Sequence, residues 1–98
     1  MQITKKTEND HVWIAPEGRL DTASAPVLEA AVGEALEHAA VLTLDLEKLE
    51  YISSAGLRVL LGAEKAMKQR GEMKLVHVGE NIMTILEMTG FTDILTIA

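Results

Sequence analysis

The chain has 98 residues, a mass of 10.7 kDa and a formal net charge of −6 at pH 7. A length of this order fits one domain with one modest core, and we expect residues 1–98 to form it. The acidic balance disfavours nucleic acids and anionic lipid surfaces as partners, and the absence of cysteine excludes disulfides and thiolate metal sites.

The apolar runs and the first residues give no sign of membrane insertion or export. No apolar run reaches the ~18 residues that suggest a membrane span. Residues 1–6 (MQITKK) lack the apolar stretch that follows the basic head of a signal peptide. We therefore expect a cytoplasmic protein.

The spacing of apolar residues alternates along the chain between the two-residue repeat of strands and the ~3.6-residue repeat of helices. Pro16 and Gly18 interrupt the second strand, and a bulge there would extend that strand to Leu20. Gly71 predicts a left-handed cap at the end of the second helix, and Gly90 closes the third. The predicted elements, in chain order, are strands at 3–5 and 11–15, a helix at 22–38, a strand at 41–46, a helix at 54–70, a strand at 73–78, a helix at 81–89 and a strand at 94–97.

This order, β-β-α-β-α-β-α-β, predicts an α/β fold with a single mixed sheet. Three β-α-β crossovers require mostly parallel strands with right-handed connections, whereas the opening pair is free to be antiparallel. The strand at 41–46 is apolar almost throughout, which is typical of a strand buried on both faces.

The sequence lacks the motifs of most catalytic and cofactor-binding sites. The three histidines, His11, His38 and His77, are too far apart in sequence to form a helical ligand pair, so we expect no metal site. The glycines form no phosphate-binding loop, the hydrolase motif G-x-S-x-G is missing, and we expect no cofactor. Asp45 ends a buried strand, but residues 3–6 lack the acidic groups of a phosphoaspartate site. We therefore interpret Asp45 as a strand-end residue that accepts a hydrogen bond from a neighbouring loop.

The segment 51–61 (YISSAGLRVLL) joins the most buried strand to the second helix. In an open α/β sheet this position lies at the carboxyl ends of the strands, where functional groups gather. Ser54 fits the N-cap of the helix, and the two serines could do no more than start it. Glycine in a first helical turn costs up to ~1 kcal/mol relative to alanine. Gly56 therefore indicates that some group approaches the backbone closely there.

Three stretches together resemble the STAS domains of the anti-sigma factor antagonist family. They are residues 44–46 (LDL) followed by 51–57 (YISSAGL), residues 17–21 (EGRLD) ahead of an alanine-rich helix, and residues 90–95 (GFTDIL). The resemblance covers essentially the whole chain in the family's order and spacing, and it implies a STAS-like fold.

The resemblance also implies roles for particular residues. It places the phosphoacceptor at Ser54, and Ser53 stands where the family commonly has aspartate, which removes a charge beside the acceptor. It implies that Ser53, Gly56 and Leu57 belong to the partner-binding surface. Asp21 would lie near the same face and contribute to partner or nucleotide contacts, or it would be a carboxylate favoured by the start of the first helix.

By this resemblance, the unmodified chain binds an anti-sigma factor that is also a serine kinase. Phosphorylation would release the complex, and a PP2C-type phosphatase would reset the cycle. The chain has none of a kinase's own parts, so we expect no enzymatic activity. An alternative is a STAS subunit that docks without phosphorylation in a larger assembly, such as a lipid-transport ABC complex. Ser53 favours this alternative, whereas Ser54 favours the switch.

Overall fold

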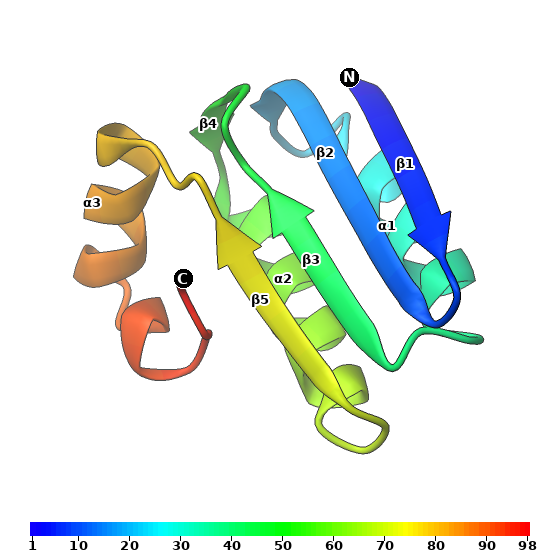
Figure 1. The fold of residues 1–98 in the computed structure, drawn as a ribbon. Coiled ribbons are helices and arrows are strands. Elements are labelled where there is room, and N and C mark those ends of the chain that lie inside the picture. Colours follow the sequence, from blue (N-terminus) through cyan, green and yellow to red (C-terminus); the bar gives the residue numbers. More distant parts are fainter.

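The computed structural model describes all 98 residues. Five strands form one mixed sheet (Figure 1). The strand order is β1-β2-β3-β5, with β4 paired to β2. Only the opening pair, β1 with β2, is antiparallel. The predicted α/β fold with a mostly parallel sheet is therefore confirmed. The strands are β1 (Gln2–Glu8), β2 (His11–Leu20), β3 (Val41–Asp45), β4 (Leu49–Ile52) and β5 (Glu72–Val76).

A bulge divides β2 into two parts with different neighbours. Residues 11–14 pair with β3, whereas residues 18–20 pair with β4, and the register shifts between Gly18 and Arg19. Gly18 has φ 98°, a left-handed conformation that glycine adopts at little cost. The predicted continuation of this strand past a bulge is confirmed.

Strand β4 was missing from the sequence prediction, which left residues 47–53 as a loop. The strand has four residues, of which Leu49 and Ile52 are buried and the two between them are exposed. This burial pattern lacks the strict alternation that identifies a half-buried strand. Pairing with β2, rather than local pattern, defines β4.

The three predicted helices are present, although the first two are shorter than predicted. They are α1 (Ala25–Ala35), α2 (Ser54–Met67) and α3 (Glu80–Met88). Pro26 lies in the first turn of α1, as expected for a residue without an N–H. No helix combines the length and the apolar run that crossing a bilayer would require.

The predicted strand at 94–97 is wrong. Residues 91–93 form a 3₁₀ turn, η1 (Phe91–Asp93), and the N–H groups of both Ile94 and Leu95 donate to the Phe91 carbonyl. These bonds curl the chain away from the sheet. The tail then pairs with β5 only in a single parallel bridge of Ile97 to Leu75, made by the Thr96 carbonyl and the Ala98 N–H. Gly90, which was predicted to close α3, follows the helix and has a left-handed conformation with φ 79°.

Helices α1 and α2 cover one face of the sheet, and α3 lies beyond the β5 edge (Figure 1). The apolar side chains between the helices and the sheet belong to one cluster of 23 buried residues. No helix covers the other face of the sheet. On that face Trp13 stacks on His11 with 3.4 Å between ring centroids, and the Lys6 ammonium lies 5.4 Å from the Trp13 ring. On β2, β3 and β5, the members of this cluster that face the helices are Val12, Ile14, Leu42, Leu44, Met73 and Leu75.

Gly71, after α2, was predicted to be a left-handed cap, and that prediction is wrong. Its φ is not positive, unlike that of Gly18 and Gly90. The residue is glycine for a different reason. A Cβ at position 71 would lie 1.9 Å from the carbonyl oxygen of Ala40, which accepts a hydrogen bond from the next N–H, that of Glu72.

This contact predicts opposite effects for two glycine substitutions. We expect Gly71→Ala to lower the free energy of unfolding by about 1–3 kcal/mol, because backbone must move to admit the methyl group. Gly62→Ala is the matched control, since a Cβ at this exposed position in α2 meets nothing within 4 Å. It should raise the free energy of unfolding by up to ~1 kcal/mol through helix propensity. Urea denaturation measures both, and equal effects of the two substitutions would contradict the close approach.

Candidate functional site

The ends of two parallel strands bring the predicted site residues together. Leu20 at the end of β2 pairs with Ile52 at the end of β4, and the Ser53 N–H donates to the Leu20 carbonyl at 2.8 Å. Asp21 and Ser53 therefore follow adjacent strands at one edge of the sheet. This is the carboxyl edge, where α/β folds present their functional groups.

Ser53, rather than Ser54, is the N-cap of α2, so the predicted cap was wrong by one residue. Ser53 has extended backbone angles, and its Oγ accepts a hydrogen bond from the Gly56 N–H at 3.4 Å. Ser54 is the first residue of the helix and is exposed. Its hydroxyl forms no hydrogen bond within the chain. The structure therefore leaves the Ser54 hydroxyl accessible and unused.

Gly56 explains the close approach that the sequence indicated. A Cβ at this position would lie 2.6 Å from Leu20 Cγ and 2.9 Å from Ile52 Cγ1. The approaching groups are thus side chains of the protein's own core, at the ends of β2 and β4. Leu57, the next residue, is also buried. Both residues pack the first turn of α2 against the strand ends and so hold Ser54, at the start of that turn, in place.

Asp21 organises the turn between β2 and α1. Its Oδ1 accepts hydrogen bonds from the N–H groups of Ala23 and Ser24, at 3.1 and 3.0 Å. The Ser24 hydroxyl lies 3.1 Å from the same oxygen and donates to the Arg19 carbonyl at 2.6 Å. The hydrogen bond from the Ser24 N–H and, after it, the nearby Ser24 hydroxyl lower the pKa of the Asp21 carboxyl below its ordinary value. The carboxylate therefore stays ionised and holds this turn beside the β4–α2 loop.

Arg19 and Tyr51 form a pair that sequence reasoning missed. They are cross-strand partners on β2 and β4, and the Arg19 guanidinium lies 4.2 Å from the centre of the Tyr51 ring. Such cation–π contacts contribute ~0.5–1 kcal/mol at exposed sites. Arg19 also lines, with Asp21, a surface hollow of about 440 Å³. The pair could have been predicted from the sequence only if residues 49–52 had been recognised as a strand, because the pairing of that strand with β2 brings Arg19 and Tyr51 together.

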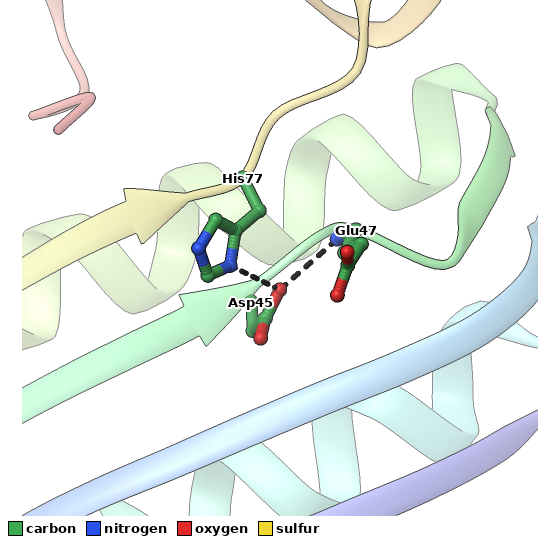
Figure 2. Close-up of polar contacts among 3 residues, drawn as sticks. All are labelled: Asp45, Glu47 and His77. Atoms are coloured by element: carbon green, nitrogen blue, oxygen red, sulfur yellow. Dashed lines mark hydrogen bonds and ion pairs between the residues drawn. The ribbon is translucent and has the colours of Figure 1, made fainter.

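A second group of polar side chains lies where β3 and β5 end (Figure 2). The Asp45 Oδ1 accepts a hydrogen bond from the Glu47 N–H and lies 3.1 Å from the His77 Nδ1. The predicted bond from Asp45 to a neighbouring loop is therefore confirmed. The histidine contact was missed, because a search for ligands at short sequence spacing cannot see residues 32 positions apart.

Comparison with known proteins identifies the family. Residues 2–98 match the STAS domain family. This chain belongs to that family. The STAS domain assignment confirms the resemblance given by the loop 51–57 and by the two stretches that flank it in sequence.

Curated relatives of this STAS domain are named as antagonists of anti-sigma factors. The anti-sigma-B factor antagonist of Listeria monocytogenes is 35% identical over 95 residues, which are 95% of this chain and 83% of the relative. A putative anti-sigma factor antagonist, BtrV of Bordetella bronchiseptica, is 36% identical over 100 residues, covering all of this chain and 86% of BtrV.

Solved structures with the same fold include other STAS domains. An anti-sigma factor antagonist from Mycobacterium paratuberculosis superimposes with a TM-score of 0.89 and 21% identity, over 98% of this chain and 83% of that one. The antagonist SpoIIAA in its unphosphorylated form gives a TM-score of 0.84 and 17% identity, over 99% and 88% of the two chains. The phosphorylated form of SpoIIAA, from Bacillus, gives 0.77 at 17% identity, over 99% and 91%.

The cap assignment in this STAS domain is testable by substitution. Ser53→Ala removes the cap oxygen, and we expect it to lower the free energy of unfolding by about 1 kcal/mol. Ser53→Asp keeps a capping oxygen and adds a charge that the helix start favours, so it should be at least as stable as the natural chain.

Ser54→Ala is the matched control for these two variants. It should change the free energy of unfolding little, since the Ser54 hydroxyl has no partner in the chain. Urea denaturation of the three variants gives the comparison. A larger loss for Ser54→Ala than for Ser53→Ala would show that the cap is misassigned.

Proposed function

We propose that this chain is an anti-sigma factor antagonist that acts by partner switching. In the unmodified state it binds an anti-sigma factor with serine kinase activity, and phosphorylation of Ser54 releases that partner. A PP2C-type phosphatase restores the unmodified state. The chain supplies a binding surface and a hydroxyl acceptor in the cytoplasm, and the catalytic groups belong to its partners.

One observation carries the proposal: the Ser54 hydroxyl is exposed and unbonded at the first residue of α2. A kinase can reach this oxygen without unfolding the helix, because Ser53 does the capping. The names of the relatives support the same role, and SpoIIAA, which shares the fold, has been solved in both phosphorylation states.

The physical logic of release rests on the charge of the phosphoryl group. Phosphorylation adds a charge of about −1.5 to −2 and three acceptor oxygens. The helix start accommodates this charge in the free protein, by about 0.3–1 kcal/mol. A partner closed against the neutral hydroxyl would instead bury the charge unpaired, which costs several kcal/mol. Each 1.4 kcal/mol is tenfold in affinity, so one phosphoryl group is sufficient to separate the complex.

Ser53 changes the charge around the acceptor relative to the family's usual aspartate. It keeps the helix cap through Oγ and removes a negative charge directly before Ser54. The partner surface for this chain is therefore expected to be less positive opposite position 53 than one that meets aspartate. Asp21 follows β2, the strand paired with β4, and belongs to the same proposed surface.

The proposal predicts phosphorylation at one residue. Incubation with ATP and the serine kinase that the unmodified chain captures from its own cells should add one phosphate to Ser54, as located by mass spectrometry. Binding of that kinase should weaken at least ~100-fold, in line with a penalty of several kcal/mol. Affinity is measured by calorimetry on the unmodified and phosphorylated chains.

Two neighbouring variants complete this experiment. Ser54→Ala should accept no phosphate, whereas Ser53→Ala, which removes the adjacent hydroxyl, should still be phosphorylated at Ser54. Phosphate on any other residue, or unchanged affinity after phosphorylation, would refute the switch. Capture of a transporter ATPase in place of a kinase would favour the docking-subunit alternative.

Arg58 provides a separate prediction about the phosphorylated state. This residue lies one turn after Ser54, is exposed, and forms no ion pair. Residues four apart share a helix face, and side chains lean toward the helix start, so the guanidinium can reach a phosphate on Ser54. With phosphoserine installed at position 54, Arg58→Gln should raise the second pKa of the phosphate by a few tenths of a unit, as expected from a pair of about 0.2–0.5 kcal/mol.

The matched control is Lys65→Gln, which removes a cation on the same exposed side of α2. Position 65 lies about 16 Å along the helix from position 54, beyond the screening length of physiological salt. ³¹P NMR titration follows the phosphate in each variant. Equal pKa values in the natural sequence and in Arg58→Gln would remove Arg58 from the account of the switch.

A further inference from the structure

A histidine and two carboxylates meet outside the β4–α2 loop, at the carboxyl ends of β3 and β5 (Figure 2). They are Asp45, Glu47 and His77, and one candidate ligand atom from each lies within 4.8 Å of the others. The close-up shows the imidazole and the Asp45 carboxylate facing each other, with Glu47 on the adjacent turn. The proposed phosphorylation switch uses none of these residues.

Strand pairing builds this cluster from two separate loops. Asp45, the last residue of β3, is the parallel partner of Val76, so the next residue along β5 is His77. His77 has φ 54°, a left-handed conformation that few residues other than glycine adopt. On the other side, the Glu47 N–H is tied to the Asp45 Oδ1 at 3.1 Å. The backbone therefore fixes the relative positions of the three residues.

The distance between the Asp45 and His77 ligand atoms matches that of two ligands on one metal ion. The Asp45 Oδ1 and His77 Nδ1 are 3.1 Å apart. Two ligand atoms bound at ~2.1 Å to a tetrahedral zinc ion would lie ~3.4 Å apart, so these two atoms would need to separate by only a few tenths of an ångström. An ion could thus replace the proton between these atoms with little movement of either residue. Glu47 is exposed and free to turn its carboxylate toward the same point.

The surroundings of the cluster favour a cation. A surface hollow of about 190 Å³ adjoins Asp45 and Glu47 on the sheet face that no helix covers. Glu17 from β2 adds a third carboxylate to its lining, and Lys48 contributes the one ammonium. Carboxylates thus outnumber the cation at this edge, which raises the local concentration of positive ions.

We propose that Asp45, Glu47 and His77 bind a divalent transition-metal ion of the zinc class. Imidazole nitrogen combined with carboxylate oxygen suits Zn²⁺ and its neighbours, whereas Mg²⁺ and Ca²⁺ prefer oxygen ligands alone. The ion joins the loop after β3 to the loop after β5. Nearby, Asn81 in the first turn of α3 donates from Nδ2 to the Glu50 carbonyl of β4 at 2.8 Å, which joins the elements that follow these two loops. Metal binding therefore stabilises the carboxyl edge of the sheet.

Titration of the purified chain with Zn²⁺, followed by calorimetry, tests the site. We expect one equivalent to bind, and His77→Asn and Asp45→Asn each to weaken binding at least ~10-fold. Asparagine is chosen at position 77 because it tolerates the left-handed backbone. His38→Asn, which removes an exposed histidine elsewhere, should leave the affinity unchanged. Mg²⁺ in large excess over Zn²⁺ should not compete.

Two further readouts distinguish this site from loose surface binding. Among the three histidines, only His77 should change its imidazole ¹⁵N shifts when Zn²⁺ is added. The melting temperature should rise with Zn²⁺ in the natural chain and in His38→Asn, but not in His77→Asn. No binding of one equivalent, or binding that survives His77→Asn, overturns the proposal. None of these measurements depends on phosphorylation, so their outcome is independent of the switch.

Discussion

The division of β2 between two neighbours is the constraint on which the proposed switch surface depends. The left-handed Gly18 shifts the register, so that the strand leaves β3 and continues beside β4. This second pairing sets Asp21 next to Ser53. It also pairs Leu20 with Ile52 where β2 and β4 both end. Gly56 then packs directly on those two side chains. A glycine almost forty residues before Gly56 in sequence thus determines where α2 begins.

Two adjacent serines divide two tasks that a single residue could not combine. The cap needs an oxygen turned back toward the helix, and the proposed acceptor needs an oxygen turned toward a partner. Ser53 supplies the first and Ser54 is free for the second. Phosphorylation at Ser54 would therefore leave the capping bond of α2 in place. The proposed switch changes the charge of a surface without dismantling the helix that presents it.

The sequence was informative wherever burial followed a local repeat. The strand at 41–46 was predicted because it is apolar almost throughout, and the three helices because their apolar residues recur at helix spacing. Strand β4 was not, since its two central residues are both exposed and only pairing with β2 makes it a strand. The bridge at Ile97 likewise depends on contact with β5. The 3₁₀ turn η1 precedes it, and most of the expected strand at 94–97 does not form.

In the site, too, features that depend on neighbouring residues were predicted, and features that depend on contacts between distant residues were not. The loop 51–57 was identified by its residues, but the choice between Ser53 and Ser54 as cap depends on where the strand before it stops. Gly71 was assigned a left-handed backbone from its place after a helix, whereas its contact is with Ala40, thirty-one positions earlier. The meeting of Asp45 and His77 likewise follows from the β3–β5 register.

The chain's one tryptophan lies on the sheet face opposite the helices, stacked on His11 and beneath Lys6. Its intrinsic fluorescence therefore reports on the uncovered side of the sheet. A partner that docks against the exposed side of α2 approaches from the other side of the molecule. Tryptophan emission would therefore change little when such a partner docks. A fluorescence assay of association needs a dye attached to α2 instead.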